Sequence, residues 1–212
     1  KAENLRVVDG AYRFDLHTEG LTLTDLILGM PGRHNVENAI AASTIALRLG
    51  VAPELLRQGL ATFKGVARRF DTRIRGPQVV FIDDYAHHPK ELDACIGSVR
   101  EMYPGKRITG VFQPHLFSRT RDLAGDFATS LATLDELLLL EIYPAREEPI
   151  PGITSQWLLD QVPMAAKAVV AKDELLQALQ AMEVEVLVTM GAGDIDRLVP
   201  SIERMLNERY RP

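Results

Sequence analysis

The sequence lacks several features that would assign it to a specialised class of protein. It contains one cysteine, Cys95, among 212 residues, so no disulfide can form within the chain and a reducing compartment is expected. No apolar run approaches the about 20 residues that a membrane-spanning helix needs. The formal net charge is −5, whereas a nucleic-acid partner usually requires a basic surface. These absences predict a soluble cytoplasmic protein that binds neither membranes nor nucleic acid.

The first residues also lack the apolar segment of a signal peptide. KAENLRVVDG is polar and does not begin with methionine, which predicts that the chain is a fragment of a longer protein. Its composition, 46% hydrophobic and 25% charged residues, is typical of globular domains. The length is enough for one large or two modest domains.

The hydrophobic pattern changes near Val66–Asp71. Upstream, two apolar stretches flank Glu19-Gly20 as in a β-hairpin, and helices are expected over residues 35–50 and 53–63. Downstream, short apolar runs alternate with amphipathic segments. This alternation predicts βαβ crossovers, and therefore an α/β fold with a mostly parallel, helix-covered sheet.

Polar clusters follow four of the predicted strands. DDYAHH follows VVFI, QPHLFSR follows ITGVF, YPAREEP follows LLLLEI, and GAGD follows VEVLVTM. The carboxyl ends of parallel strands meet at one edge of a sheet, and functional residues lie outside that edge. We therefore expect the four clusters to lie together.

A metal centre is one interpretation of the side chains in these clusters. Asp83, Asp84, His87, His88 and His115 could supply oxygen and nitrogen ligands. However, the chain has no HExxH motif and no Cys/His set, and paired histidines before a proline are equally typical of a turn or helix N-cap. We expect no dedicated metal site, and a metal-dependent hydrolase remains an alternative.

Four further features allow both a structural and a functional interpretation. GAGDID at 191–196 lies where a phosphate-binding turn would, but the third glycine of that pattern is missing, which favours a tight strand-to-helix turn. Arg119 is expected near a helix N-terminus, where the dipole disfavours a cation unless an anionic ligand binds. Asn35 can cap the following helix, with Asn38 on the same face. Arg68 and its neighbour could be solvated linker charges or phosphate clamps.

The motifs of the chain, taken in order, resemble those of the Mur ligases from Met30 to the last helix. They are MPGRHNVENAIAA, FKGVARRFD, IDDYAHHPKEL, FQPHLFSRTRDL, LLLLEIYPAREEPIPGITS and TMGAGDI. FQPHLFSRTRD and EIYPAREEPIPG favour the members that use L-alanine over those that add later amino acids and over the murein-peptide recycling ligase. The resemblance implies that residues 1–68 end a central ATPase domain, and that residues 69–212 form a Rossmann-like C-terminal domain.

The resemblance also implies a reaction. ATP, with Mg²⁺, would phosphorylate the lactyl carboxylate of UDP-N-acetylmuramate, and the amine of L-alanine would attack the acyl phosphate during peptidoglycan synthesis. Asn35 and Asn38 match asparagines that contact adenine, Arg69 matches an arginine that grips the ATP phosphates, and Asp84 matches an acid that accepts hydrogen bonds from the ribose. A non-catalytic nucleotide-binding module is the alternative of another class.

Five further positions match residues at the reacting end of the family's site. His34 matches a residue near the reacting carboxylate and metal. Tyr85, His87, His115 and Arg119 match residues that hold the muramyl and alanine groups, where preorganised positive charge suits an anionic acyl-transfer transition state.

Two departures from the family pattern limit what the resemblance implies. Some members carry arginine where this chain has Leu116, so the substrate carboxylate is expected to be held differently. The GxxxxGK[ST] motif, whose backbone and lysine hold the transferred phosphates, does not occur in the 212 residues. The isolated chain is therefore expected to be inactive and to bind nucleotide weakly, with ATP and Mg²⁺ held largely by other parts of the protein.

Overall fold

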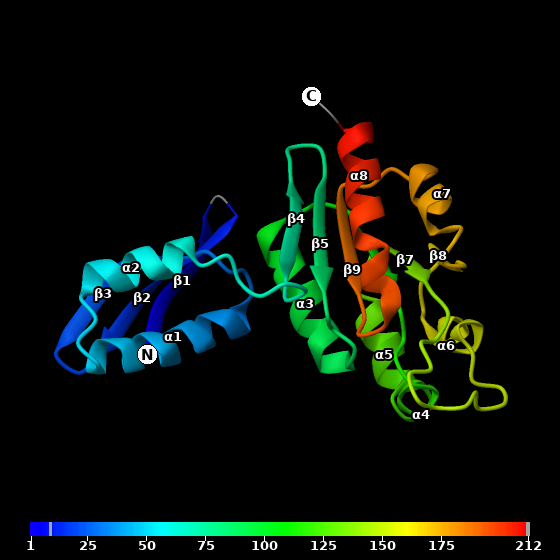
Figure 1. Ribbon diagram of the computed structural model, residues 1–212, viewed down its shortest axis with the longest axis horizontal. Coiled ribbons are helices and arrows are strands. Elements are labelled where there is room, and N and C mark those ends of the chain that lie inside the picture. The colour runs from blue at the N-terminus through cyan, green and yellow to red at the C-terminus, as the bar shows by residue number, and fades with distance from the viewer. Residues whose placement is uncertain (9, 211–212) are drawn as a thin grey trace.

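The computed structural model describes residues 1–8 and 10–210, which form two sheets, each with its own helices (Figure 1). The first sheet is antiparallel and contains β1 (Ala2–Val8), β2 (Ala11–Thr18) and β3 (Leu21–Leu28). The chain turns between β2 and β3 at Glu19-Gly20, as the sequence predicts, and Gly20 has a φ of 78° that favours glycine.

Two helices cover this small sheet, α1 (Arg33–Arg48) and α2 (Pro53–Thr62). Both agree with the predicted helices, and Gly50 follows the end of α1 with a φ of 86°, as is common after a helix C-cap. Asn35, however, does not cap α1. Gly32 holds that position, and the Asn35 side chain lies in the first turn, where its amide donates to the carbonyl of Pro31.

The second sheet has six strands in the order β4-β5-β9-β6-β7-β8. The strands are β4 (Asp71–Arg75), β5 (Val80–Asp84), β6 (Ile108–Phe112), β7 (Glu136–Leu139), β8 (Lys167–Val169) and β9 (Val186–Met190). All neighbouring pairs are parallel except β4 and β5, which are antiparallel. The predicted α/β fold with a mostly parallel sheet is confirmed.

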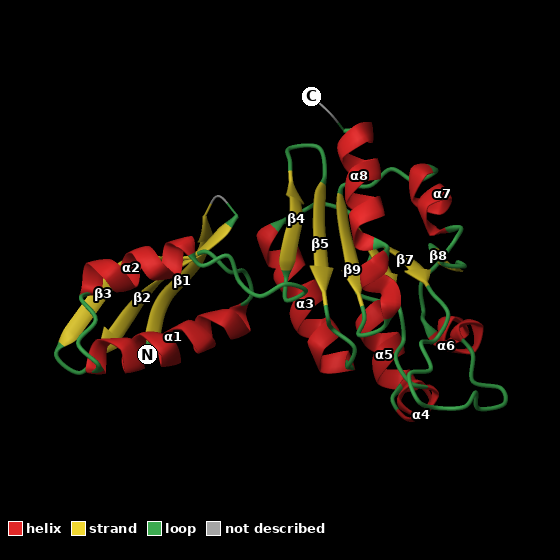
Figure 2. Ribbon diagram, in the orientation of Figure 1, coloured by secondary structure: helices red, strands yellow, loops and turns green. Residues whose placement is uncertain are grey.

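Helices pack on both faces of the six-stranded sheet (Figure 2). One face is covered by α3 (Pro89–Met102), α5 (Ala124–Leu131) and α6 (Ser155–Gln161). The other is covered by α7 (Leu175–Gln180) and α8 (Val199–Arg209). Burial on both faces explains why β6 and β9 are buried along their length and mostly apolar. No helix within the described residues is long and apolar enough to cross a bilayer.

Three elements differ from the sequence-based expectation. Strand β4 lies in a segment without apolar periodicity, and it pairs with β5 alone at the sheet edge. Helix α4 (Phe117–Asp122) occupies part of the expected loop QPHLFSR. The single helix predicted at the end of the chain is a 3₁₀ turn, η1 (Asp194–Arg197), followed by α8. Pro200 lies in the first turn of α8, where a missing N–H and a fixed φ favour a new helix start.

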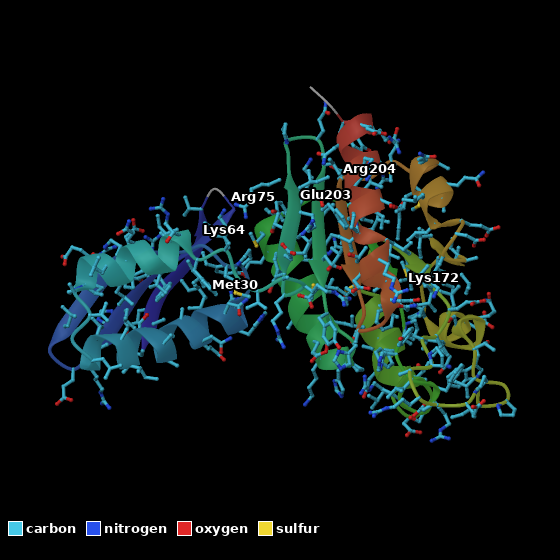
Figure 3. The ribbon with its side chains drawn as sticks, in the orientation of Figure 1. Met30, Lys64, Arg75, Lys172, Glu203 and Arg204 are labelled. Carbon is cyan, nitrogen blue, oxygen red and sulfur yellow. The ribbon has the colours of Figure 1, made fainter. Side chains whose placement is uncertain are left out.

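Residues 63–70 connect the two sheets, and Figure 3 shows Met30 and Lys64 in the region between them. A polar contact joins the same two parts of the molecule. The Glu101 carboxylate on α3 accepts from Arg33 Nη2 and Nε at 2.7 and 2.9 Å, and from Tyr12 Oη at 2.7 Å. Tyr12 is fully buried, so its hydroxyl depends on this partner.

Candidate functional site

Two cavities adjoin where residues 63–70 cross between the sheets. A cavity of about 670 Å³ lies between α1 and α2, is mostly apolar, and is lined at its polar part by His34, Asn35, Asn38 and Arg69. A second cavity of about 270 Å³ is lined by His34 and Arg69 again. Because these two side chains line both cavities, the cavities adjoin at His34 and Arg69.

The second cavity also brings in the edge of the six-stranded sheet. Asp84, at the end of β5, and Tyr85 and His87, which follow this strand, also line the cavity. The two cavities together therefore contain seven of the nine predicted site residues. His115 and Arg119 line neither cavity.

The asparagine pair lies on the first turns of α1. Asn35 is buried, and its side-chain oxygen accepts from Asn38 Nδ2 at 3.4 Å. The exposed Asn38 amide retains both donor and acceptor capacity toward the cavity. An amide beside apolar walls suits the edge and face of a purine, so these residues fit an adenine group.

Asp84 ties the connecting segment to the sheet. One carboxylate oxygen accepts from Phe70 N–H and the other from Ala86 N–H, each at 2.7 Å. Burial raises the pKa of Asp84 to about 6, against the opposing effect of these two N–H groups. Each oxygen has a further lone pair, so the carboxylate can still accept from a ligand hydroxyl.

Arg68, whose role the sequence leaves open, is held by the sheet edge. Its Nη2 donates to the Gly191 carbonyl at 2.6 Å, its Nε lies 3.4 Å from Asp83, and its Nη1 lies 3.6 Å from Asp196. Its guanidinium carbon lies 4.9 Å from the centroid of the Tyr85 ring. The adjacent Arg69 is exposed and faces the two cavities instead.

The backbone of this segment is strained. Arg68 and Phe70 have φ values of 61° and 49°, which for residues other than glycine cost on the order of 1–3 kcal/mol each. The Arg68 carbonyl accepts from Tyr85 N–H at 2.6 Å, and Asp84 binds the Phe70 N–H. These contacts hold the strained segment against the end of β5.

A row of aromatic rings extends the site to the other strands. The ring centroids are 5.2 Å apart for Tyr85 and His87, 6.0 Å for His87 and His115, and 5.6 Å for His115 and Tyr143. Tyr143 forms a β-bridge with His115 beyond the ends of β6 and β7. The row thus links the predicted His115 to the second cavity.

His115 and Arg119 retain unused hydrogen-bonding groups. Burial, followed by the Arg119 and His87 charges, lowers the pKa of His115, so the imidazole is neutral at pH 7. His115 Nδ1 and Arg119 Nη1 are buried without a hydrogen-bond partner among the described residues. Six other side-chain atoms of the described residues share this state, including Arg68 Nε. What distinguishes His115 and Arg119 is their place beside the aromatic row, where these two groups are available to a ligand.

Arg119 lies near a helix N-terminus, as the sequence predicts. It is the third residue of α4, but this helix has only six residues, so Arg119 is also within one turn of its C-terminal end. The dipole of so short a helix therefore does not decide whether a cation is favoured there. The case for an anionic ligand rests on the unpartnered Nη1. Leu116, at the start of α4, has a φ of 75°.

The paired histidines form a helix cap. His88 is the N-cap of α3, and its side chain accepts from Lys90 N–H. Glu91 accepts from the N–H groups of His87 and His88 at 2.9 and 3.1 Å, which completes a capping box. Within residues 1–8 and 10–210, no three His, Cys, Asp or Glu side chains are placed to hold a metal ion.

A buried amide network fixes the GAGD turn to the sheet edge. Gln113 Nε2 donates to Asp194 at 2.8 Å, and Gln113 Oε1 accepts from Ile195 N–H at 2.9 Å. Lys172, labelled in Figure 3, also donates to Asp194, at 2.8 Å. The polar groups of this turn are engaged within the protein, as in the tight turn that the sequence favours.

A protein-family model described as "Mur ligase, glutamate ligase domain" matches residues 68–193. The chain belongs to the Mur ligase family. The match begins at the strained connecting segment and includes the strand-end clusters DDYAHH, QPHLFSR and YPAREEP. The resemblance carried by the sequence motifs is thereby confirmed.

Individual Mur ligases match almost the whole chain. A UDP-N-acetylmuramate–L-alanine ligase of Parabacteroides distasonis is 51% identical over 99% of this chain and 46% of its own length. The crystal structure of a UDP-N-acetylmuramate–alanine ligase from Thermotoga maritima superposes with a TM-score of 0.79 at 28% identity, covering 99% of this chain and 45% of that one. The chain thus spans about half the length of the curated relatives it matches.

A more distant Mur ligase structure shows the same fold with a nucleotide. The MurF ligase of T. maritima in complex with ADP superposes with a TM-score of 0.70 at 17% identity, covering 98% of this chain and 47% of that one.

Arg68, Gln113 and Tyr143 join the site without having been assigned a role from sequence. Tyr143 and Gln113 begin the clusters YPAREEP and QPHLFSR, each of which follows a predicted strand. Their place directly after a strand could therefore have predicted that they lie at the sheet edge. The partners of Arg68 lie up to 128 residues away, and no local pattern indicates them.

Proposed function

We propose that the intact protein joins L-alanine to UDP-N-acetylmuramate at the expense of ATP, in peptidoglycan synthesis. The observation that carries this proposal is the junction of the two cavities at His34 and Arg69. Asn35 and Asn38 line the α1 side of this junction, and Asp84, Tyr85 and His87 line the sheet-edge side, which supports the proposal. Curated relatives about 50% identical over nearly all of this chain carry the name of this activity.

The nucleotide would lie across the connecting segment. In this proposal residues 1–68 end the central ATPase domain and residues 69–212 are the C-terminal domain. Asn35 and Asn38 would contact the adenine, Arg69 would bind phosphate oxygens bidentately, and Asp84 would accept from the ribose. The ADP complex of a Mur ligase with the same fold supports a nucleotide in this family.

The muramyl group of UDP-N-acetylmuramate and L-alanine would lie along the row of aromatic rings from Tyr85 to Tyr143. Tyr85 and His87 would position the muramyl group, while neutral His115 and the free Nη1 of Arg119 would donate to oxygens that become anionic as the amide forms. His34 lies between the two halves of the site, and partial burial together with Arg69 lowers its pKa. A neutral His34 can accept a hydrogen bond without adding charge beside Arg69.

Residues 1–8 and 10–210 contain no group of three His, Cys, Asp or Glu side chains placed to hold a metal ion. Magnesium is usually held by one or two carboxylates together with substrate phosphates and water. We therefore propose that the nucleotide phosphates and other parts of the intact ligase hold most of the Mg²⁺ coordination. ATP and a UDP-linked substrate place the reaction in the cytoplasm.

Phosphate release by the intact gene product tests the proposal. The assay contains ATP, Mg²⁺ and UDP-N-acetylmuramate, with L-alanine or a murein tripeptide added in parallel. We expect release that depends on L-alanine alone, and no turnover by the isolated 212-residue chain. Release only with the tripeptide would indicate the recycling ligase, and silence with both would favour a binding module.

A further inference from the structure

We propose that Arg68 is a positioning residue that couples the Tyr85 side of the site to the phosphate-binding arginine beside it. The inference rests on the proposed function for Tyr85 and Arg69, and it adds a role for a side chain that lines neither cavity. Arg68 connects to Tyr85 in two ways, through its guanidinium over the ring at 4.9 Å and through its carbonyl, which accepts from Tyr85 N–H at 2.6 Å.

The remaining contacts of Arg68 fix it to three different parts of the sheet edge. Asp83 lies in the last part of β5, Gly191 follows β9, and Asp196 lies in η1. The position of the Arg68 side chain therefore depends on the relative positions of β5, β9 and η1. A planar guanidinium with five N–H donors can satisfy these acceptors and stack on an aromatic ring at once.

The strained backbone makes this coupling direct. Arg68 and Phe70 flank Arg69, and both have positive φ values. Such conformations persist only where surrounding contacts hold them. A displacement of the Tyr85 ring therefore shifts the Arg68 guanidinium and loosens the segment, and Arg69 moves with it. Arg69 would grip phosphate correctly only when Tyr85 is in its ligand-holding position.

Arg68→Lys tests the coupling in the intact protein. Lysine keeps the positive charge near Asp83 and Asp196 but cannot donate as a fork or stack in a plane. We expect kcat/KM for L-alanine-dependent phosphate release to fall roughly 10- to 100-fold, the scale of a small misplacement at a reacting centre. Arg73→Lys is the matched control, because Arg73 lies on β4 and lines neither cavity. Its guanidinium donates hydrogen bonds to Glu203 on α8 and to Asp71 on β4. This control should leave the rate within about twofold.

A double-mutant cycle with Tyr85→Leu separates coupling from a general loss of structure. If Arg68 acts through Tyr85, the double variant is no slower than the slower single variant. Full activity of Arg68→Lys, or losses that multiply in the double variant, would overturn the inference.

Hydrogen exchange supplies a readout that does not depend on activity. The Tyr85 and Phe70 amides should exchange at least about tenfold faster in Arg68→Lys than in Arg73→Lys. Unchanged exchange would contradict the inference even in an active ligase. If the wild-type protein shows no L-alanine-dependent turnover, the proposed function fails, while the exchange comparison still decides whether Arg68 holds this segment.

Discussion

The two halves of the molecule differ in how completely they bury their apolar side chains. Around the first sheet, five large apolar residues between positions 45 and 66 are more than half exposed: Ile45, Leu49, Leu55, Phe63 and Val66. Within the described part of residues 71–212, Tyr85 is the one exposed large hydrophobic residue, and it lies in the site. In the described part of this half, an aromatic side chain is exposed only where a ligand is proposed to bind.

The difference also bears on stability. The six-stranded sheet has apolar cores on both faces, whereas the three-stranded sheet has helices on one side and relies on contacts such as Tyr12–Glu101. A segment of about 60 residues buries too small a share of its surface to be more than marginally stable alone. The site therefore lies between a half expected to be stable alone and a half whose stability depends on contacts with it.

Separating the halves should have the largest effect. Residues 66–212 produced alone should unfold cooperatively in urea, because their sheet is covered on both faces. Residues 1–65 should show no cooperative transition. Circular dichroism during urea titration of each piece measures this, with the 212-residue chain as reference. A cooperative transition for residues 1–65 would remove the distinction drawn here.

Breaking the contact between the halves should have an intermediate effect. Glu101→Ala removes the acceptor of the Arg33 fork and of the buried Tyr12 hydroxyl. We expect the free energy of unfolding to fall by about 2 kcal/mol, mainly because a buried donor loses its partner. Glu208→Ala, at an exposed position on α8, serves as control with a change below about 0.5 kcal/mol. Equal stability of the two variants would show that the contact is not structural.

Histidine titration should give the smallest effect. Burial lowers the pKa of His34 and of His115, so the unfolded chain binds these protons more readily than the folded one. Their contribution to the unfolding free energy is therefore lost as the pH falls below about 6.5. Carbon-bound ring proton shifts in NMR should give midpoints below that value for both residues. Midpoints at or above it would contradict the described environments.

Asp84 should titrate with the opposite sign. Its folded pKa of about 6 lies above its ordinary value, so the folded chain holds this proton more tightly. Stability from this group is full below about pH 4 and is lost as the pH rises to about 6. Carboxyl carbon shifts measured by NMR report the midpoint, and one near pH 4 would contradict the buried position.

The sequence predicts the fold well where burial is complete. Continuous apolar runs such as VVFID and ITGVF could only be strands covered on both faces, and their ends located four polar clusters at one edge. The sequence did not predict strand β4, because an edge strand pairs with a single neighbour and needs no continuous apolar run. The cap assigned to Asn35 failed because Gly32 already starts the helix, which leaves the amide to bond Pro31.

The site was predictable to the extent that it depends on strand ends and on family motifs. Seven predicted residues surround the adjoining cavities, and the aromatic row brings His115 close. The family motif assigned Arg69 to the ATP phosphates, but the sequence could not show what the neighbouring Arg68 contacts. Arg68 is committed to Gly191 and Asp83 by tertiary contacts, and this leaves Arg69 as the side chain that faces the cavities.

The most direct test of the account is the rate of L-alanine-dependent phosphate release by the intact protein carrying Arg69→Ala. The account predicts a loss of at least about 100-fold, the usual effect of removing a preorganised group that stabilises transition-state charge. Arg57→Ala, which removes contacts to the Thr24 and Asp25 carbonyls beside α2, should stay near the wild-type rate. An Arg69→Ala variant as active as Arg57→Ala would contradict a site built across the connecting segment.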